Sequence, residues 1–138
     1  MDAITKNQED LGKLILRLAV GGLLLFHGIS KVIHGVAWMH GPLGALHLPS
    51  FIAYGAYIGE VVAPVLLILG VWTRISGLIV SFDLFMAYIL VTHSRMFTIG
   101  PAGGWGLELD AFYFLGGLCV FLLGAGKFSV GGARGKWN

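Results

Sequence analysis

The stretch LAVGGLLLFHGISKV, residues 18–32, decides the fold class, because it is almost wholly apolar yet ends with charged and titratable groups. The hydrocarbon core of a bilayer, about 30 Å thick, needs roughly 20 apolar residues of helix. The apolar run extends over about residues 14–33 and reaches that length. It therefore predicts a membrane-spanning helix. His27 and Lys31, one turn apart near its end, then need partners from elsewhere in the chain.

The composition indicates an integral membrane protein, with the lipid bilayer as its main partner. Of 138 residues, 57% are hydrophobic and only 12% are charged, whereas soluble domains have about 25% charged residues. A small soluble domain has too much surface to bury so many apolar side chains. The net charge of +2 gives no reason to expect nucleic acid binding. With one cysteine, Cys119, the chain cannot form an internal disulfide.

Four segments have the length and hydropathy of a membrane span. They cover about residues 14–33, 51–71, 75–92 and 107–124. Trp38, Trp72 and Trp105 fall at or near the ends of these segments, as interfacial aromatic residues do. The expected fold is all-α, a transmembrane four-helix bundle that forms one domain over residues 1–138. The last ten residues, SVGGARGKWN, are expected to form a short loose tail.

The distribution of basic residues predicts the orientation of the bundle. Four spans place both termini on the same side of the membrane. Seven basic residues fall on that side, and two on the other. Basic residues concentrate in cytoplasmic loops, so both termini are predicted to be cytoplasmic. The first span is not followed by a cleavage-site pattern and is expected to remain in the protein as an anchor.

Several ionisable residues lie at depths where an isolated charge is costly, which makes each a functional candidate. With a helix rise of about 1.5 Å per residue, Glu60 and Asp83 lie within about 2 Å of the midplane. Arg17 lies about 9 Å toward the cytoplasm and His27 about 6 Å toward the outside. We expect Arg17 to extend toward the two acids from one side and His27 from the other. The alternative for the acids is that they are protonated and only hold helices together.

A second set of groups lies nearer the outer surface. Lys31, Glu108 and Asp110 all lie roughly 8–12 Å from the midplane. A salt bridge from Lys31 on the first span to these acids on the fourth is therefore predicted. Tyr57 shares the helix face of Glu60. The alternative for Lys31, as for Arg17, is that the long side chain extends to the headgroups.

The histidines do not predict a haem or a metal site. His34, His40 and His47 are spaced six to seven residues apart in a loop, unlike a compact set of ligands. His27 and His93 differ in depth by about 8 Å, too far to ligate one haem iron from both sides. No nucleotide-binding or hydrolase motif is present. We expect no metal and no covalently bound cofactor.

An ordered set of short motifs resembles the DoxX family over about residues 11–130. The set is Arg17 and Gly21, HGISK (27–31), Glu60 with Pro64, LGVWTR (69–74), Glu108, and GAGKFS (124–129). The resemblance implies a small four-span, multi-pass protein of the bacterial inner membrane. Relatives in this family include a subunit of an archaeal thiosulfate:quinone oxidoreductase and proteins associated with redox and thiol-stress defence. By matching position, it marks as family-type the residues Arg17, His27, Lys31, Glu60, Arg74 and Glu108.

Two functional hypotheses follow. In the first, the chain is a redox-associated subunit that binds a quinone-like molecule in the bundle, and electrons come from a soluble or membrane oxidoreductase partner. His27 and Glu60 would carry protons. Ligand binding or charge balance would fall to Arg17, Lys31, Tyr57, Asp83, Glu108 and Asp110. In the second, the chain is a non-catalytic scaffold or a transporter of a small solute or protons. Its glycine-rich helix surfaces are compatible with a homo-oligomer.

Overall fold

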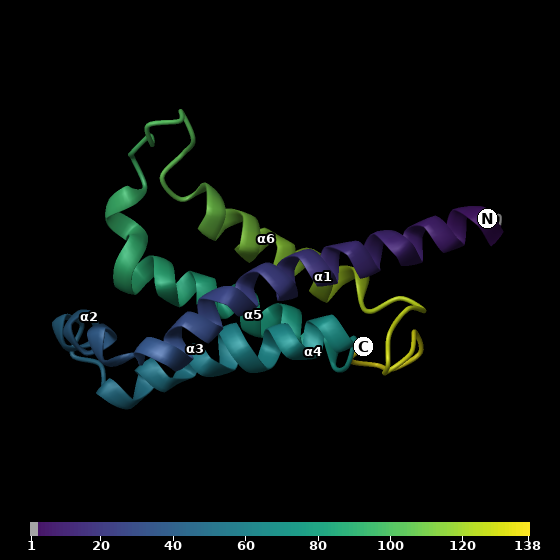
Figure 1. The fold of residues 1–138 in the computed structure, drawn as a ribbon, viewed down its shortest axis with the longest axis horizontal. Coiled ribbons are helices and arrows are strands. Elements are labelled where there is room, and N and C mark those ends of the chain that lie inside the picture. The colour runs from purple at the N-terminus through teal and green to yellow at the C-terminus, as the bar shows by residue number, and fades with distance from the viewer. Residues whose placement is uncertain (1–2) are drawn as a thin grey trace.

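The computed structural model describes residues 3–138, and this part of the chain is helical with no strand. Figure 1 shows the arrangement of the helices. The α-helices are α1 (Ala3–His34), α2 (His40–Ala45), α3 (Gly55–Tyr57), α4 (Ala63–Leu69), α5 (Thr73–Ala87) and α6 (Glu108–Leu123). The 3₁₀ segments are η1 (Ala37–Met39), η2 (Ser50–Tyr54) and η5 (His93–Arg95), and the π-helical segments are η3 (Ile58–Val62) and η4 (Tyr88–Thr92).

Three helical rods have the length and hydropathy of membrane spans. One is α1, and the others are the continuous helical stretches Ser50–Leu69 and Thr73–Arg95. The fourth predicted span coincides with α6, whose 16 residues measure about 24 Å and fall short of the typical span length. The second, third and fourth predicted segments match helices closely, whereas α1 begins eleven residues before the first predicted segment. The all-α fold class is confirmed.

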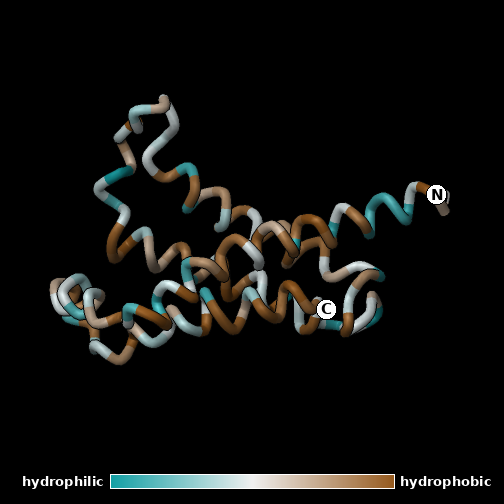
Figure 2. Tube along the Cα trace, viewed as in Figure 1, coloured by the Kyte–Doolittle hydropathy of each residue, from teal (hydrophilic) through white to brown (hydrophobic). Residues whose placement is uncertain are grey.

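The surface of these rods is largely apolar, as a bilayer requires. Figure 2 shows long hydrophobic stretches along the helices, with hydrophilic residues near the start of α1, in the connecting loops and at a few positions within the bundle. Large apolar side chains such as Phe26, Phe112 and Leu122 are exposed along α1 and α6. In water such an exposed apolar surface would cause aggregation, whereas acyl chains cover it without cost. The chain is therefore a multi-pass membrane protein.

The first turns of α1 and the tail after α6 lie at the same end of the bundle (Figure 1). In Figure 1, the first described turns of α1 and the tail after α6 lie at one end, whereas α2 and the loop between η5 and α6 lie at the other. Helices α5 and α6 form a hairpin. They cross at glycines, since a Cβ on Gly77 would come within 2.6 Å of the Gly117 carbonyl oxygen. Small residues of this kind let membrane helices approach closely.

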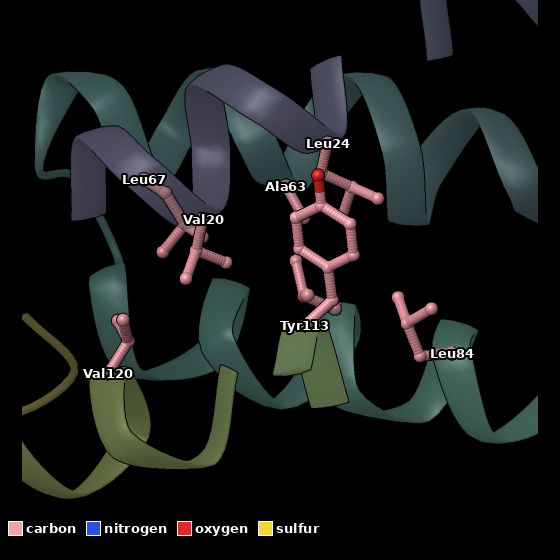
Figure 3. Packing of buried hydrophobic residues seen from close by; sticks show 8 residues of the cluster. Val20, Leu24, Ala63, Leu67, Leu84, Tyr113 and Val120 are labelled. Atoms are coloured by element: carbon pink, nitrogen blue, oxygen red, sulfur yellow. The ribbon is translucent and has the colours of Figure 1, made fainter. Parts of the chain in front are cut away.

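The apolar core lies where α1 crosses the other helices. Figure 3 shows side chains of α1, α4, α5 and α6 meeting there. Its members are Val20 and Leu24 of α1, Ala63 and Leu67 of α4, Val80 and Leu84 of α5, and Tyr113 and Val120 of α6. This core fixes α1 against α4, and so places the polar residues of the next two turns of α1.

Two adjacent glycines of α1 provide a matched test of this packing. A Cβ on Gly21 would lie 2.8 Å from the Pro64 carbonyl oxygen, whereas a Cβ on Gly22 would meet nothing within 4 Å. Overpacking costs about 1–3 kcal/mol, and replacing glycine by alanine within a helix gains about 1 kcal/mol. We expect Gly21→Ala to lower the melting temperature in detergent and Gly22→Ala to leave it unchanged or raise it. Equal melting temperatures for the two variants would contradict the α1–α4 contact.

The tail after α6 is not loose, and this expectation from the sequence is wrong. The Val130 N–H donates to the Leu69 carbonyl oxygen at 3.0 Å, and the Gly131 N–H donates to that of Gly70 at 3.0 Å. The Thr73 hydroxyl donates to the Asn138 side-chain oxygen at 2.8 Å, and Asn138 is buried. The tail therefore covers the ends of α4 and α5 with hydrogen bonds that its polar and glycine-rich composition did not reveal.

Candidate functional site

The site begins with an irregular turn in the second helical rod. Pro64 has no N–H, so it cannot donate to the carbonyl of Glu60 four residues earlier. The chain adopts the wider π-helical turn η3 here, in which the Ala63 N–H donates to the Ile58 carbonyl five residues back. Such π-helical turns occur frequently at functional sites. In this case the turn presents Glu60 toward α1.

Lys31 of α1 forms a salt bridge with the Glu60 carboxylate. The two side chains are only 17% and 8% exposed. The Tyr57 hydroxyl donates to the Lys31 carbonyl at 3.2 Å. One turn before Lys31, Gly28 leaves no room for a Cβ, which would overlap the backbone carbonyl of Glu60. Direct backbone contact at Gly28 therefore allows the Lys31–Glu60 pair to form.

The predicted salt bridge from Lys31 to Glu108 or Asp110 is wrong. Figure 1 shows the first turn of α6 well away from the last turns of α1. Glu108 is exposed and lies against Gly104. Asp110 is half-buried and lines a separate cavity of about 290 Å³ between α5 and α6. The depths matched, but the side chains are on different sides of the bundle.

Asp83 of α5 is the third ionisable group at the site. Its carboxyl lies against Gly59, where a Cβ would collide with it. One carboxyl oxygen of Asp83 is buried and has no hydrogen-bond partner among the described residues. A buried polar atom without a partner is costly, and so indicates a place where a ligand or water could form a hydrogen bond. Gly59, next to Glu60, is the residue that lets α5 bring this group so close.

Lys31, Glu60 and Asp83 all line one cavity of about 620 Å³ between the second and third helical rods. Its other walls are almost wholly apolar and include Trp38, Met39, Ile52, Ala56, Ile79, Met86, Leu90 and Val91. Phe82 and Ile58, which also line it, are 65% and 53% exposed on the outer face of the bundle. The cavity therefore opens sideways, toward the acyl chains that would surround these helices.

Arg17 has a structural role and contacts neither acid. It is 0% exposed, so it does not extend to the headgroups either. Its guanidinium donates to the Leu67 carbonyl at 3.4 Å and to the Phe128 carbonyl at 2.5 Å. A cation is favourable at the C-terminal end of a helix such as α4. The predicted extension of Arg17 toward Glu60 and Asp83 is therefore wrong.

Arg74 performs the same task at α6. It donates to the carbonyls of Phe121 at 2.7 Å and Leu122 at 2.9 Å, in the last turn of that helix. Arg17 and Arg74 thus hold helix ends and the tail, at the opposite end of the bundle from α2.

His27 does not line the 620 Å³ cavity. It is exposed, and its ring packs edge-on against Tyr113 with the ring centroids 5.9 Å apart. Residues 3–138 contain no group of three His, Cys, Asp or Glu side chains placed to hold a metal. The sequence interpretation missed Gly59, Trp38 and Phe82 as site residues. The Gly55-x3-Gly59 spacing was the available signal, but such spacing usually reflects helix packing alone.

Comparison with known proteins identifies the family. The DoxX family profile matches residues 12–93. A protein of Bacillus subtilis (strain 168), named "Putative oxidoreductase CatD", is 35% identical over 82 residues, which cover 59% of this chain and 60% of that protein. An uncharacterized protein of Haemophilus influenzae is 31% identical over 119 residues, 83% of this chain and 84% of that protein. No solved structure matches significantly. The matched segment contains the whole cavity lining, and the chain belongs to the DoxX family.

Proposed function

We propose that the chain binds a quinone-like molecule in the lateral cavity and acts as a redox-associated membrane subunit. The observation that carries the proposal is the meeting of Lys31, Glu60 and Asp83 in an apolar cavity that opens toward lipid. A quinone has a ring with two carbonyl oxygens and an apolar tail. Ligand cavities typically join apolar walls to a few polar groups in this way. The volume of about 620 Å³ lies within the usual range for small-molecule sites.

The charged groups suit the chemistry of a quinone. Its reduction to a quinol takes up two electrons and two protons. In this proposal Glu60 and Asp83 each pass one proton to the quinone. Glu60, which is ionised in its pair with Lys31, first takes up a proton from water, and Lys31 balances the negative charge that remains after the transfer. Asp83 here replaces His27 of the sequence-based hypothesis, because the His27 ring lies outside the cavity lining. General acid catalysis requires such groups within hydrogen-bond reach of the reacting oxygens.

The electrons would come from a partner oxidoreductase, soluble or in the membrane. The B. subtilis relative, named "Putative oxidoreductase CatD", supports a redox association. In the proposed arrangement the chain lies in the bacterial inner membrane with four passes and both termini cytoplasmic. The seven basic residues on the side of the termini, against two on the other, support this orientation.

Quinone binding is testable through the cavity wall. Ala87 lines the cavity, and Ala87→Phe would fill part of it. Ala111→Phe is the matched control, because Ala111 lies on α6 and lines the separate cavity beside Asp110. Quinones quench tryptophan fluorescence, and Trp38 lines the cavity. We expect a short-chain quinone to quench the wild type and Ala111→Phe equally, and Ala87→Phe to bind at least about 10-fold more weakly. Equal binding by all three proteins would refute the site.

Proton delivery is testable in the membrane with the partner present. General acid groups contribute about 10²–10⁴-fold to rate. We expect Glu60→Gln and Asp83→Asn each to lower partner-linked quinone reduction by at least about 100-fold, while both variants still bind the quinone. Turnover at the wild-type rate in a folded Glu60→Gln protein would exclude the proposed role of this residue.

The alternative is a non-catalytic scaffold or a small-solute or proton transporter. The Lys31–Glu60 bridge joins α1 to η3, and so it could serve helix register alone. A scaffold predicts that Glu60→Gln lowers the melting temperature and that no quinone binds. A transporter predicts uptake into proteoliposomes that depends on both Glu60 and Asp83, and would need a homo-oligomer to enclose a path.

A further inference from the structure

A second cavity, of about 500 Å³, lies at the end of the bundle that carries the tail. Its walls come from the first turns of α1, the start of α5, the end of α6 and the tail. Four basic side chains line it, from Lys6, Lys13, Arg74 and Lys127, against one acid, Asp10. The quinone-like site does not include any of these residues.

The tail is shaped to complete this cavity. Gly126 has φ +73°, a conformation that favours glycine, and a Cβ there would lie 3.0 Å from the Asp10 carboxylate. The Lys127 N–H donates to Asp10 at 3.3 Å, and the Lys127 ammonium donates to the Asn7 side chain. Lys13 lies 3.8 Å from the same carboxylate. Asp10 is thus engaged with the basic groups around it, and the cavity keeps a net positive charge.

The cavity begins at the hydrocarbon edge and extends through the headgroup layer, with Lys6 at its aqueous side. Lys13 immediately precedes the apolar run of α1 and so marks the edge of the hydrocarbon. Lys6 lies about 10 Å farther out along the helix, and each headgroup layer is roughly 5–7 Å thick. Leu123, the last residue of α6, lines the cavity and is 49% exposed. A positively charged cavity therefore adjoins an apolar edge on its hydrocarbon side.

We propose that this cavity binds the phosphate of an anionic phospholipid, with Lys6, Lys13 and Lys127 around the phosphate and Leu123 against the first part of the acyl chain. Basic pockets at the ends of membrane helices hold anionic headgroups in this way. A free phosphate ion would use the same basic groups but gain nothing from Leu123. The proposal is independent of the quinone-like ligand.

Two pairs of substitutions of equal charge test it. Lys6→Gln/Lys13→Gln removes two basic groups from the cavity wall. Arg134→Gln/Lys136→Gln removes two exposed basic groups from the tail, outside the cavity. Native mass spectrometry of protein from mixed phosphatidylglycerol and phosphatidylethanolamine measures the lipid retained. We expect wild type and the tail variant to prefer phosphatidylglycerol equally, and the cavity variant to bind it about 10- to 30-fold more weakly.

Three results would overturn the assignment. Equal losses in the two double variants would show diffuse surface charge instead of a site. The absence of a preference for phosphatidylglycerol in the wild type would show that the cavity does not select an anionic lipid. Displacement of the lipid by millimolar inorganic phosphate, with the same dependence on Lys6 and Lys13, would identify a site for a free anion.

Discussion

Replacing Arg17 with alanine is expected to destabilise the protein by about 3–5 kcal/mol and to release the tail. The substitution leaves a cavity in a fully buried position and removes the donor from the carbonyls of Leu67 and Phe128. Large-to-small substitutions in cores cost about 2–5 kcal/mol, and each buried polar group left unsatisfied costs about 1–3 kcal/mol. Thermal unfolding in detergent would measure the first effect. Tryptic cleavage after Lys127, in the released tail, would measure the second.

The matched control is Arg134→Ala, because Arg134 is exposed in the same tail. Arg134→Ala should have the melting temperature of the wild type and should resist cleavage after Lys127 as the wild type does. The melting temperature of Arg17→Lys should lie between those of the wild type and Arg17→Ala. An ammonium can still donate to one carbonyl but lacks the planar, forked geometry of a guanidinium. An Arg17→Ala protein with the wild-type melting temperature and a protected tail would contradict the helix-end role of this residue.

Replacing Lys31 with methionine is expected to be the more damaging way of breaking the Lys31–Glu60 pair. The methionine leaves two acids, Glu60 and Asp83, in the apolar cavity without the cation. Removing one partner of a buried pair costs about 3–5 kcal/mol, because the other charge stays buried. Glu60→Gln should cost less, since Asp83 remains beside the cavity to balance Lys31. Denaturation in detergent would show which of the two variants is less stable.

The double variant Lys31→Met/Glu60→Gln distinguishes the net contribution of the ion pair to stability from the cost of leaving one charge buried without its partner. Neutral replacements of a buried ion pair are often tolerated, so we expect the double variant to be more stable than Lys31→Met alone. Lys136→Met, on the tail surface, controls for the loss of a lysine. If Lys31→Met were as stable as Lys136→Met, the salt bridge would make no net contribution to the free energy of unfolding.

The sequence was sufficient to predict the apolar part of each long helix, although not the first turns of α1 or the short helices between Ala37 and Ala45. Residues 51–71 and 75–92 correspond to the rods Ser50–Leu69 and Thr73–Arg95 within three residues at each end. This success has a physical cause, because a span must satisfy all its backbone hydrogen bonds internally and cover about 30 Å of hydrocarbon. Both constraints act along the chain and are visible in composition. The same reasoning identified Glu60 and Asp83 as exceptional, since few acids lie at that depth.

The partners of the charged residues were harder to predict. Depth along the membrane normal is one coordinate, and it matched Lys31 with Glu108 and Asp110 in preference to Glu60, its actual partner. The position around the bundle depends on helix rotation and on close contacts such as Gly28 against the Glu60 carbonyl. The π-helical turn at Ile58–Val62 also rotates the residues that follow it. Helix rotation, close glycine contacts and the π-helical turn cannot be inferred from the depth of a residue within its span.

The sequence by itself determined that the chain is a helical membrane protein, which segments form its long apolar helices, and which few charged residues lie within them. Only the tertiary structure decided that Lys31 pairs with Glu60, that Asp83 adjoins them through Gly59, and that Arg17 holds the end of α4 and the tail. The reason is that hydropathy is a property of each segment, whereas a pairing depends on which faces of two helices meet. That choice is made by glycines and carbonyls that carry no charge and leave little trace in the hydropathy pattern.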